Sequence, residues 1–288
     1  MKFSLMLLML LSSQVWAKWS VSTYNIRNFD KDFVAGRTDI SELQKIIKEY
    51  QSDVMAFEEI VNDKAFKTLM TSTLPTYDYK ISSCGGGGKQ RLALAYNPAV
   101  FNFIEVVEDY TFSGSSNACG SLRPMLLVTL ELKSTKQKMS FGVLHLKAGG
   151  AQNAMTQRWQ QYQKIEKLAA KYEKSHLVLL GDLNTTGYNI KDQDYTRFED
   201  TLNKAGLRTM SENLGCTSYW AGPVLNAADH QPSILDHIVL QDKNVAGVQD
   251  VRVGAHCAAS ACRPTAPADL GNSYAAVSDH CPVQVTFK

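Results

Sequence analysis

The chain has 288 residues, of which 44% are hydrophobic and 20% are charged. These are globular proportions and exclude a disordered or fibrous chain. The formal net charge of +2 neither supports nor excludes nucleic acid as a ligand, because local clusters of charge matter more than totals. No Pro/Gly-rich linker divides the chain, so we expect one domain over residues 18–288.

The first 17 residues have the pattern of a secretory signal peptide. Lys2 precedes an apolar run from Phe3 to Leu11, and Val15 and Ala17 occupy the two positions that a signal peptidase reads. The run is far shorter than the ~20 residues that span a bilayer. We expect cleavage after Ala17 and a secreted or periplasmic protein without membrane anchoring; a buried N-terminal helix is the alternative.

Six cysteines follow in the mature part, an even number that favours disulfides in an exported chain. They are Cys84, Cys119, Cys216, Cys257, Cys262 and Cys281. Their spacing fits no zinc pattern. Cys84 and Cys119 both lie in Gly/Ser-rich loops ahead of apolar strands and form the best candidate pair. Cys281 opens an apolar strand and is equally compatible with a buried thiol.

Apolar periodicity predicts strands that alternate with a few helices. Strands are expected over residues 19–26, where the alternation suggests half burial, and over 53–57, 91–96, 100–107, 123–132, 139–146, 176–182, 234–240 and 281–287. Helices are expected over 40–50, capped by Thr38 or Asp39, and over 63–70, 153–172 and 195–205. This order predicts an α/β fold in which mixed sheets pack together with helices outside.

Polar residues gather where the predicted strands end. They are Asn25, Glu58, Glu59, His145, Asp182, Asn184, Asp236, Asp279 and His280. A lone Asp at a strand end is usually a turn residue, but six such places with one kind of chemistry indicate a site, because α/β folds build their sites at strand ends.

The chemistry of this set suits hydrolysis of a phosphoester. Carboxylate and amide oxygens without a thiolate cluster favour Mg²⁺, with Mn²⁺ or Ca²⁺ as alternatives. Two histidines that can pair with carboxylates suit proton transfer near neutral pH. The chain has no nucleophile elbow, P-loop or dinucleotide fingerprint. Metal-assisted attack of water on a phosphate is the reaction that needs such a set.

The ordered motifs resemble those of the endonuclease/exonuclease/phosphatase superfamily, the deoxyribonuclease I-like fold. They are TYNIR at Thr23, DVMAFEEI at Asp53, RPMLLV at Arg123, GVLHLKAG at Gly142, GDLN at Gly181, LDHIVL at Leu235 and SDHCPV at Ser278. The resemblance covers almost the whole mature chain and implies a four-layer α/β sandwich of two packed mixed β-sheets flanked by helices.

The resemblance also implies roles for the first half of the set. Asp182 would activate the attacking water, and Asn184 would contact the phosphate. Asn25 would position a carboxylate or the phosphate near the metal. Glu59 would be the main metal ligand, rather than Glu58, which stands where the family often has Gln.

For the second half, Asp279 would add a metal ligand and His280 would contact the phosphate. Asp236 would hold His280 by a hydrogen bond. His145 resembles the family's second catalytic histidine. In pancreatic-type deoxyribonucleases a Glu supports that histidine; the nearest residue here is Gln90, which makes a role of His145 as general acid less secure.

The remaining cations and histidines receive plainer interpretations. Arg123 either contacts the phosphate or anchors a loop, and Arg27 lies in a basic segment that could grip flanking phosphates. Arg158, on the long helix, is expected on a solvated face, with bracing of the active-site loops as the alternative. Four histidines are expected to be structural, surface or loop residues: His176, His230, His237 and His256.

Export favours an extracellular enzyme, so the leading hypothesis is a monomeric, metal-dependent deoxyribonuclease with little sequence preference and DNA as its partner. A secreted phosphatase or sphingomyelinase-type phosphodiesterase is the alternative. A catalytically inactive binding module is the third hypothesis, which the complete polar set disfavours. DNA or RNA preference, the preferred metal and endo- or exonucleolytic action stay open.

Overall fold

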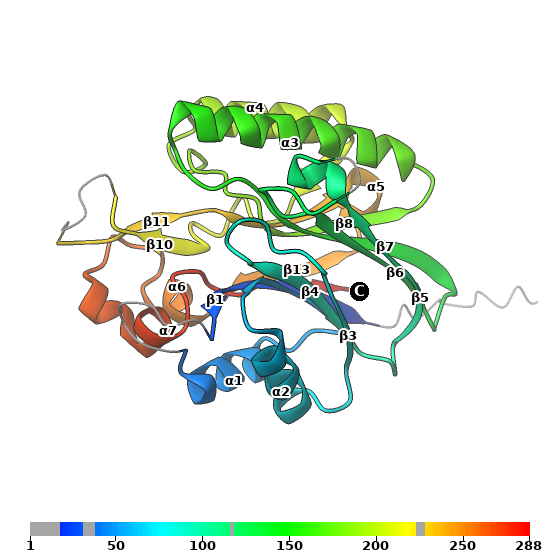
Figure 1. Ribbon diagram of the computed structural model, residues 1–288, viewed down its shortest axis with the longest axis horizontal. Helices are drawn as coiled ribbons and strands as arrows, with labels where there is room; N and C mark the ends of the chain where they lie inside the picture. The colour runs from blue at the N-terminus through cyan, green and yellow to red at the C-terminus, as the bar shows by residue number, and fades with distance from the viewer. Residues whose placement is uncertain (1–17, 31–37, 116–117, 223–227) are drawn as a thin grey trace, which may run out of the picture.

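The computed structural model describes residues 18–30, 38–115, 118–222 and 228–288, so the predicted signal peptide lies outside the described residues. Two six-stranded sheets pack face to face, with helices on their outer faces (Figure 1). This arrangement confirms the predicted four-layer α/β fold. Among the described residues, no helix has both the length and the apolar character that crossing a membrane requires.

The first sheet has the strand order β13-β14-β1-β2-β4-β3. Its strands are β1 (Trp19–Phe29), β2 (Val54–Ile60), β3 (Asp78–Ile81), β4 (Arg91–Tyr96), β13 (Val248–Val253) and β14 (Val283–Phe287). Helices α1 (Ile40–Glu49) and α2 (Asp63–Thr73) cover its outer face (Figure 1). The Asp39 side chain accepts a hydrogen bond from the backbone of Glu42 and caps α1, which settles the choice between Thr38 and Asp39.

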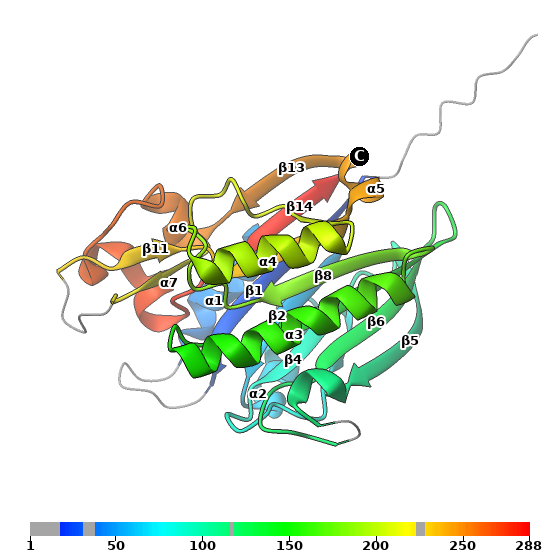
Figure 2. The same ribbon diagram turned by 90° about the horizontal axis from the view of Figure 1, so that it is seen from above.

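The second sheet has the order β5-β6-β7-β8-β12-β9. Its strands are β5 (Phe101–Asp109), β6 (Met125–Leu132), β7 (Gln137–His145), β8 (His176–Asp182), β9 (Leu207–Thr209) and β12 (Asp236–Gln241). Helices α3 (Gln152–Lys171) and α4 (Gln193–Lys204) lie across its outer face (Figure 2). Strands β7 and β8 run parallel, whereas β12 runs antiparallel to β8.

The main core lies between the two sheets and is built from their inward-facing apolar side chains. Trp19 stacks on Phe287 with ring centroids 4.0 Å apart. The expectation that β1 is half-buried is wrong, because β1 is a central strand with the second sheet on one face and α1 on the other. Val21 and Ile26 are both fully buried, and two covered faces need apolar residues on both.

Short elements and disulfides complete the fold. They are β10 (Ser218–Trp220), β11 (Gln231–Ser233), α5 (Asp242–Val245), α6 (Ala255–Ala259), α7 (Gly271–Ala276) and the 3₁₀ turns Tyr110–Ser113 and Pro267–Leu270. Cys84 pairs with Cys119, as predicted from the sequence. Cys216 pairs with Cys262, and Cys257 with Cys281, so Cys281 is not a free thiol.

Candidate active site

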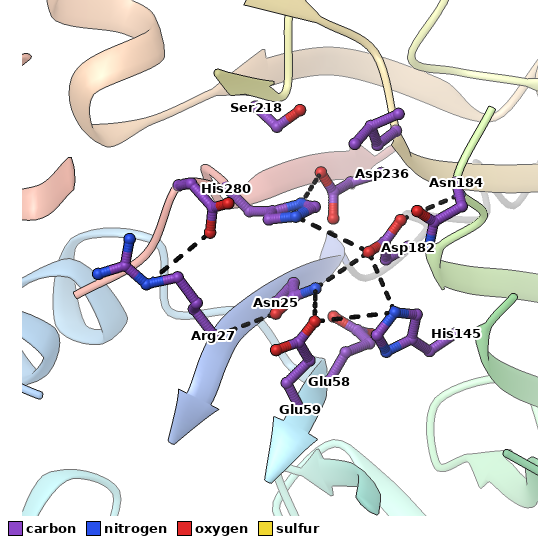
Figure 3. A network of polar contacts seen from close by, with 12 residues as sticks. Asn25, Arg27, Glu58, Glu59, His145, Asp182, Asn184, Ser218, Asp236 and His280 are labelled. Carbon is purple, nitrogen blue, oxygen red and sulfur yellow. Dashed lines mark hydrogen bonds and ion pairs between the residues drawn. The ribbon is translucent and has the colours of Figure 1, made fainter. Parts of the chain in front are cut away.

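The polar residues singled out in the sequence meet where strands of the two sheets end side by side (Figure 3). Strand register forces part of this arrangement. His145 at the end of β7 is the register partner of Asp182 on β8, and Asp182 also faces Asp236 at the start of β12. In the first sheet, Asn25 on β1 pairs with Glu58 on β2. Neighbouring strands therefore deliver these side chains to one place.

Asp182 is the centre of the cluster. Its Oδ2 accepts a hydrogen bond from Asn25 Nδ2 at 3.0 Å and lies 3.4 Å from His145 Nε2 and 3.8 Å from His280 Nε2. Its Oδ1 accepts the backbone N–H of Asn184 at 3.0 Å. Burial raises the pKa of Asp182 to about 7, the His280 charge opposes that shift, and other acidic charges add to it. Such a carboxyl can exchange a proton near neutral pH.

His280 is held by a carboxylate. Its Nδ1 lies 2.8 Å from Asp236 Oδ2, and Asp236 is fully buried. Burial alone would lower the pKa of His280, but the charges of Asp236 and Asp182 raise it well above its ordinary value. His280 is therefore an imidazolium at neutral pH, with Nδ1–H directed at Asp236 and Nε2–H directed into the cluster.

His145 is held differently. Its Nε2 lies 3.8 Å from Glu59 Oε1, but its buried Nδ1 has no hydrogen-bond partner among the described residues. Gln90 does not support it, because Gln90 Oε1 accepts from Arg123 and its Nε2 donates to Asn28 Oδ1, both at 3.0 Å. Burial, with the charges of Arg123 and His280, holds the pKa of His145 well below its ordinary value. The ring is neutral at neutral pH.

The two neighbouring glutamates of β2 point in different directions. Glu59 has a backbone φ of 65°, and its Oε1 accepts from Asn25 Nδ2 at 3.2 Å while its Oε2 accepts the Asn28 N–H at 2.8 Å. Glu58 is fully buried and accepts from Thr23, and burial raises its pKa well above the ordinary value. A left-handed conformation costs a non-glycine residue roughly 1–2 kcal/mol. The backbone at Glu59 is therefore strained, and this conformation directs its side chain into the cluster.

The donor set fits a hard divalent cation. Ligand atoms of Glu59, His145 and Asp182 lie within 4.8 Å of one another, and Asp182, Asp236 and His280 form a second such group. Oxygen donors of this kind suit Mg²⁺, Mn²⁺ or Ca²⁺. Asp279 belongs to neither group; its carboxylate lies 3.9 Å from Arg27 Nε and its side chain is 38% exposed.

The two predicted phosphate-binding arginines have different surroundings. Arg123 donates from Nε to the carbonyl oxygen of His145 at 2.9 Å and from Nη2 to that of Leu146 at 2.7 Å. Of its two predicted roles, this geometry shows loop anchoring. Arg27 lies at the rim, where its Nη2 donates to the Ala275 carbonyl at 3.3 Å. Arg27 thus keeps a positive charge beside Asp279.

Two of the plain expectations are wrong. His237 and His256 are not surface or loop residues but are 0% and 1% exposed. His237 lies on the face opposite Asp236, as alternation predicts, with its ring nitrogens 2.7 Å from Thr185 Oγ1 and 2.8 Å from Thr209 Oγ1. Burial lowers its pKa to about 3. Such a histidine is a neutral, hydrogen-bonded core residue.

A third expectation is also wrong. Arg158 is 0% exposed rather than solvated. Thr217 is a contributor that the sequence did not suggest, because its Oγ1 accepts the backbone N–H of Asp236 at 2.9 Å and so fixes the start of β12. Ser278 is another: its hydroxyl donates to the Asn25 carbonyl and accepts the His280 N–H. For Ser278 the available signal in the sequence was its place as the first residue of the SDHCPV motif. No motif contains Thr217.

A family model decides the relationship. The model described as the endonuclease/exonuclease/phosphatase family matches residues 22–280. The chain belongs to this family. Its enzymes are divalent-metal-dependent hydrolases of phosphoesters, and the cluster around Asp182 lies where the motifs of the family converge. No curated protein sequence matches the chain.

Solved structures with the same fold extend over the whole domain. D. rerio TDP2 complexed with single strand DNA product has a TM-score of 0.67 and 15% identity, covering 94% of this chain and 99% of that chain. A family protein from Bacteroides thetaiotaomicron has a TM-score of 0.61 and 18% identity, covering 94% and 97%. The human Nocturnin catalytic domain with bound sulfate anion has a TM-score of 0.61 and 15% identity, covering 94% of both chains. These similarities show a shared fold.

Proposed function

We propose that the protein is a secreted, divalent-metal-dependent phosphodiesterase that hydrolyses DNA endonucleolytically with little sequence preference. The observation that carries the proposal is the surroundings of Asp182. One buried carboxylate with a pKa of about 7 contacts Asn25 and lies within 4 Å of two histidines whose pKa values are shifted in opposite directions. This is the equipment for activating water beside an anionic phosphate.

Glu59 would hold the cation, Mg²⁺ by preference, together with the side-chain oxygen of its neighbour Asn25. Asp279, which lies beside Arg27 and outside both groups of close ligand atoms, would be a further ligand. When bound, the cation supplies charge neutralisation at the phosphate. Asn25 Nδ2 already bridges Glu59 and Asp182, at 3.2 Å and 3.0 Å, so one amide sets the metal ligand and the proton acceptor in register.

The protein side chains would then divide the reaction. Asp182 takes the proton from the attacking water. Asn184, whose backbone N–H binds Asp182, offers its side-chain amide to a phosphate oxygen. His280 directs its charged Nε2–H at the phosphate and stabilises the negative charge that develops there. His145 is neutral, so it donates a hydrogen bond to the phosphate or leaving oxygen rather than delivering a proton from an imidazolium.

DNA is the proposed substrate for two reasons. A protein of the same fold, D. rerio TDP2, was solved with single strand DNA product. The N-terminal pattern of residues 1–17 favours export, which suits degradation of extracellular DNA. Arg27 stands at the rim and would contact a flanking phosphate, so binding should weaken as salt rises.

A substrate panel tests the proposal. Residues 18–288 would be incubated with supercoiled plasmid, single-stranded DNA, RNA and sphingomyelin vesicles, each with Mg²⁺ and with EDTA. The proposal predicts relaxed and then linear plasmid only with Mg²⁺. Intact plasmid together with phosphocholine release would contradict it and favour the sphingomyelinase-type alternative. RNA cleavage without DNA cleavage would contradict the substrate assignment alone.

A further inference from the structure

The segment that follows His145 has no regular secondary structure, yet its backbone is densely bound. Arg123 binds the carbonyl oxygens of His145 and Leu146, as described above. The carbonyl oxygens of Lys147 and Gly149 accept hydrogen bonds from Arg158 Nη1 at 2.6 Å and 3.0 Å. The Lys147 N–H donates to Gln161 Oε1 at 2.8 Å. Two arginines and one glutamine therefore fix the path of this segment.

Arg158 reaches the segment from inside the protein. It lies on α3 with no exposed surface, and its Nη2 lies 2.7 Å from Asp194 Oδ2 on α4. Trp159 Nε1 holds the other Asp194 oxygen at 2.8 Å. A buried guanidinium is tolerated only when a counter-charge and further acceptors satisfy its donors. Asp194 supplies the charge and the Lys147 and Gly149 carbonyls supply acceptors.

The same guanidinium also contacts the second catalytic segment. Its Nη2 donates to Thr186 Oγ1 at 2.9 Å. Thr186 follows Asn184 by two residues, and its N–H donates to the Asn184 carbonyl at 2.8 Å. One rigid, planar group thus joins the segment after His145 to the segment after Asp182.

The orientation of the His145 ring depends on how these two segments are held. A histidine in an active site is commonly oriented through its second ring nitrogen, and the Nδ1 atom of His145 has no hydrogen-bond partner among the described residues. Its ring orientation therefore depends on packing, on the carboxylates near Nε2 and on the position of its own backbone. The arginines bind this backbone at the carbonyls of His145, Leu146, Lys147 and Gly149.

We propose that Arg158 is a positioning residue: its guanidinium fixes the segments after His145 and after Asp182 relative to each other, in place of a side-chain partner for His145 Nδ1, which has none among the described residues. The inference rests on the proposed phosphodiesterase site. It assigns no contact between Arg158 and the substrate.

The first test is Arg158→Lys. A lysine keeps the charge opposite Asp194, but one ammonium group cannot reach Asp194, two carbonyls and Thr186 together. Bis(p-nitrophenyl) phosphate would serve as substrate beside plasmid DNA, because any phosphodiesterase of this kind can be assayed with it. We expect kcat to fall about 10- to 100-fold, the effect of a misplacement of about 1 Å, with KM within about twofold of the parent value.

Arg197→Lys is the matched control. Arg197 is exposed on α4 and packs over the Trp159 ring at 4.7 Å, so the same substitution there should leave kcat unchanged. A purely structural role for Arg158 predicts that the loss disappears when the assay temperature is lowered in step with the melting temperature of the variant. A loss that persists at low temperature supports positioning; full recovery overturns it.

The variant Thr186→Val keeps the inference testable, through two readouts, if the lysine variant folds poorly. Thr186→Val retains the ion pair and removes only the hydroxyl between Arg158 and the second segment; we expect kcat to fall about fivefold, the worth of one hydrogen bond. In histidine-selective NMR spectra of Thr186→Val, the His145 resonance should shift, while that of His256, which contacts Ser273 outside both segments, should not. An unmoved His145 signal would overturn the inference. Hydrolysis of the small diester without DNA cleavage would instead contradict only the proposed substrate.

Discussion

The two histidines of the site are held in position by different contacts. His280 is held through its side chain, with Nδ1 2.8 Å from the buried carboxylate of Asp236. His145 is held through its backbone, because Arg123 binds its carbonyl and its own Nδ1 lacks a partner among the described residues. The difference sets their charges: the carboxylate raises the pKa of His280, after burial has lowered it, whereas burial and nearby cations lower the pKa of His145.

The comparison teaches that the groups that position a histidine side chain also influence its pKa. A carboxylate partner makes a histidine a cation that can neutralise a phosphate. At His145, burial is the main cause of the lowered pKa, and the positive charge of Arg123, whose binding of the His145 carbonyl forms a backbone clamp, adds to it. The site therefore holds one charged and one neutral imidazole on either side of Asp182.

Asp236→Asn should have the largest effect, because it removes the carboxylate that holds His280 and raises its pKa. The amide oxygen can still accept from Nδ1, but the charge that raises the pKa of His280 is lost. We expect kcat at pH 8 to fall about 100-fold and the deficit to shrink as pH falls and His280 regains its proton. The measurement is the pH–rate profile of the variant against the parent.

Asp242→Asn is the control for that experiment, since Asp242 directly follows the same strand and is exposed. It should change neither rate nor profile. A deficit of the Asp236 variant that is equal at every pH would show that Asp236 acts on structure rather than on the charge of His280.

The pH dependence of the parent enzyme is the next largest effect. Asp182 accepts a proton only as a carboxylate, and its raised pKa of about 7 means that the ionised fraction falls as pH decreases. Below that pKa, kcat should fall about tenfold per pH unit. A bound cation favours the carboxylate and moves this limb to lower pH, never higher. Measuring kcat from pH 5 to 9 at saturating Mg²⁺ checks the sign; a rate that rises toward acid would contradict the role of Asp182.

Gln90→Glu should have the smallest effect. It tests whether the side chain at position 90 supports His145. The new carboxylate would face Arg123 rather than His145, because Gln90 Oε1 already accepts from Arg123. The substitution leaves the hydrogen bond from Arg123 to the His145 carbonyl in place. We therefore expect kcat to change by less than about threefold, the effect of a single surface contact. A large gain in kcat, with a basic shift of the His145 titration in NMR spectra, would show that Gln90 does support His145.

Much of the fold could be predicted because the central strands are continuous apolar runs. The edge strands β3 and β13 could not, because they contain Asp78, Lys80 and Asp250, and pairing along a single side stabilises them despite these polar residues. Such pairing joins residues that are distant in sequence, so periodicity within one segment does not reveal it.

The site shows the same division. Asp182, Glu59 and His280 were predictable because polar residues stand out at the ends of apolar strands. The burial of Arg158 was not, since its counter-ion Asp194 lies 36 residues away on another helix. His237 was misjudged for the same reason, because Thr185 and Thr209 reach it from separate segments.

The most direct test of the whole account is a plasmid-nicking assay with residues 18–288 and their Asp182→Asn variant, with Mg²⁺ and with EDTA. Asn keeps the shape of Asp182 but cannot accept a proton. The account predicts relaxed and linear DNA from the parent with Mg²⁺ alone, and a loss in the variant of roughly 10³-fold or more. Equal nicking by both proteins, or nicking that persists in EDTA, would contradict a metal-dependent reaction centred on Asp182.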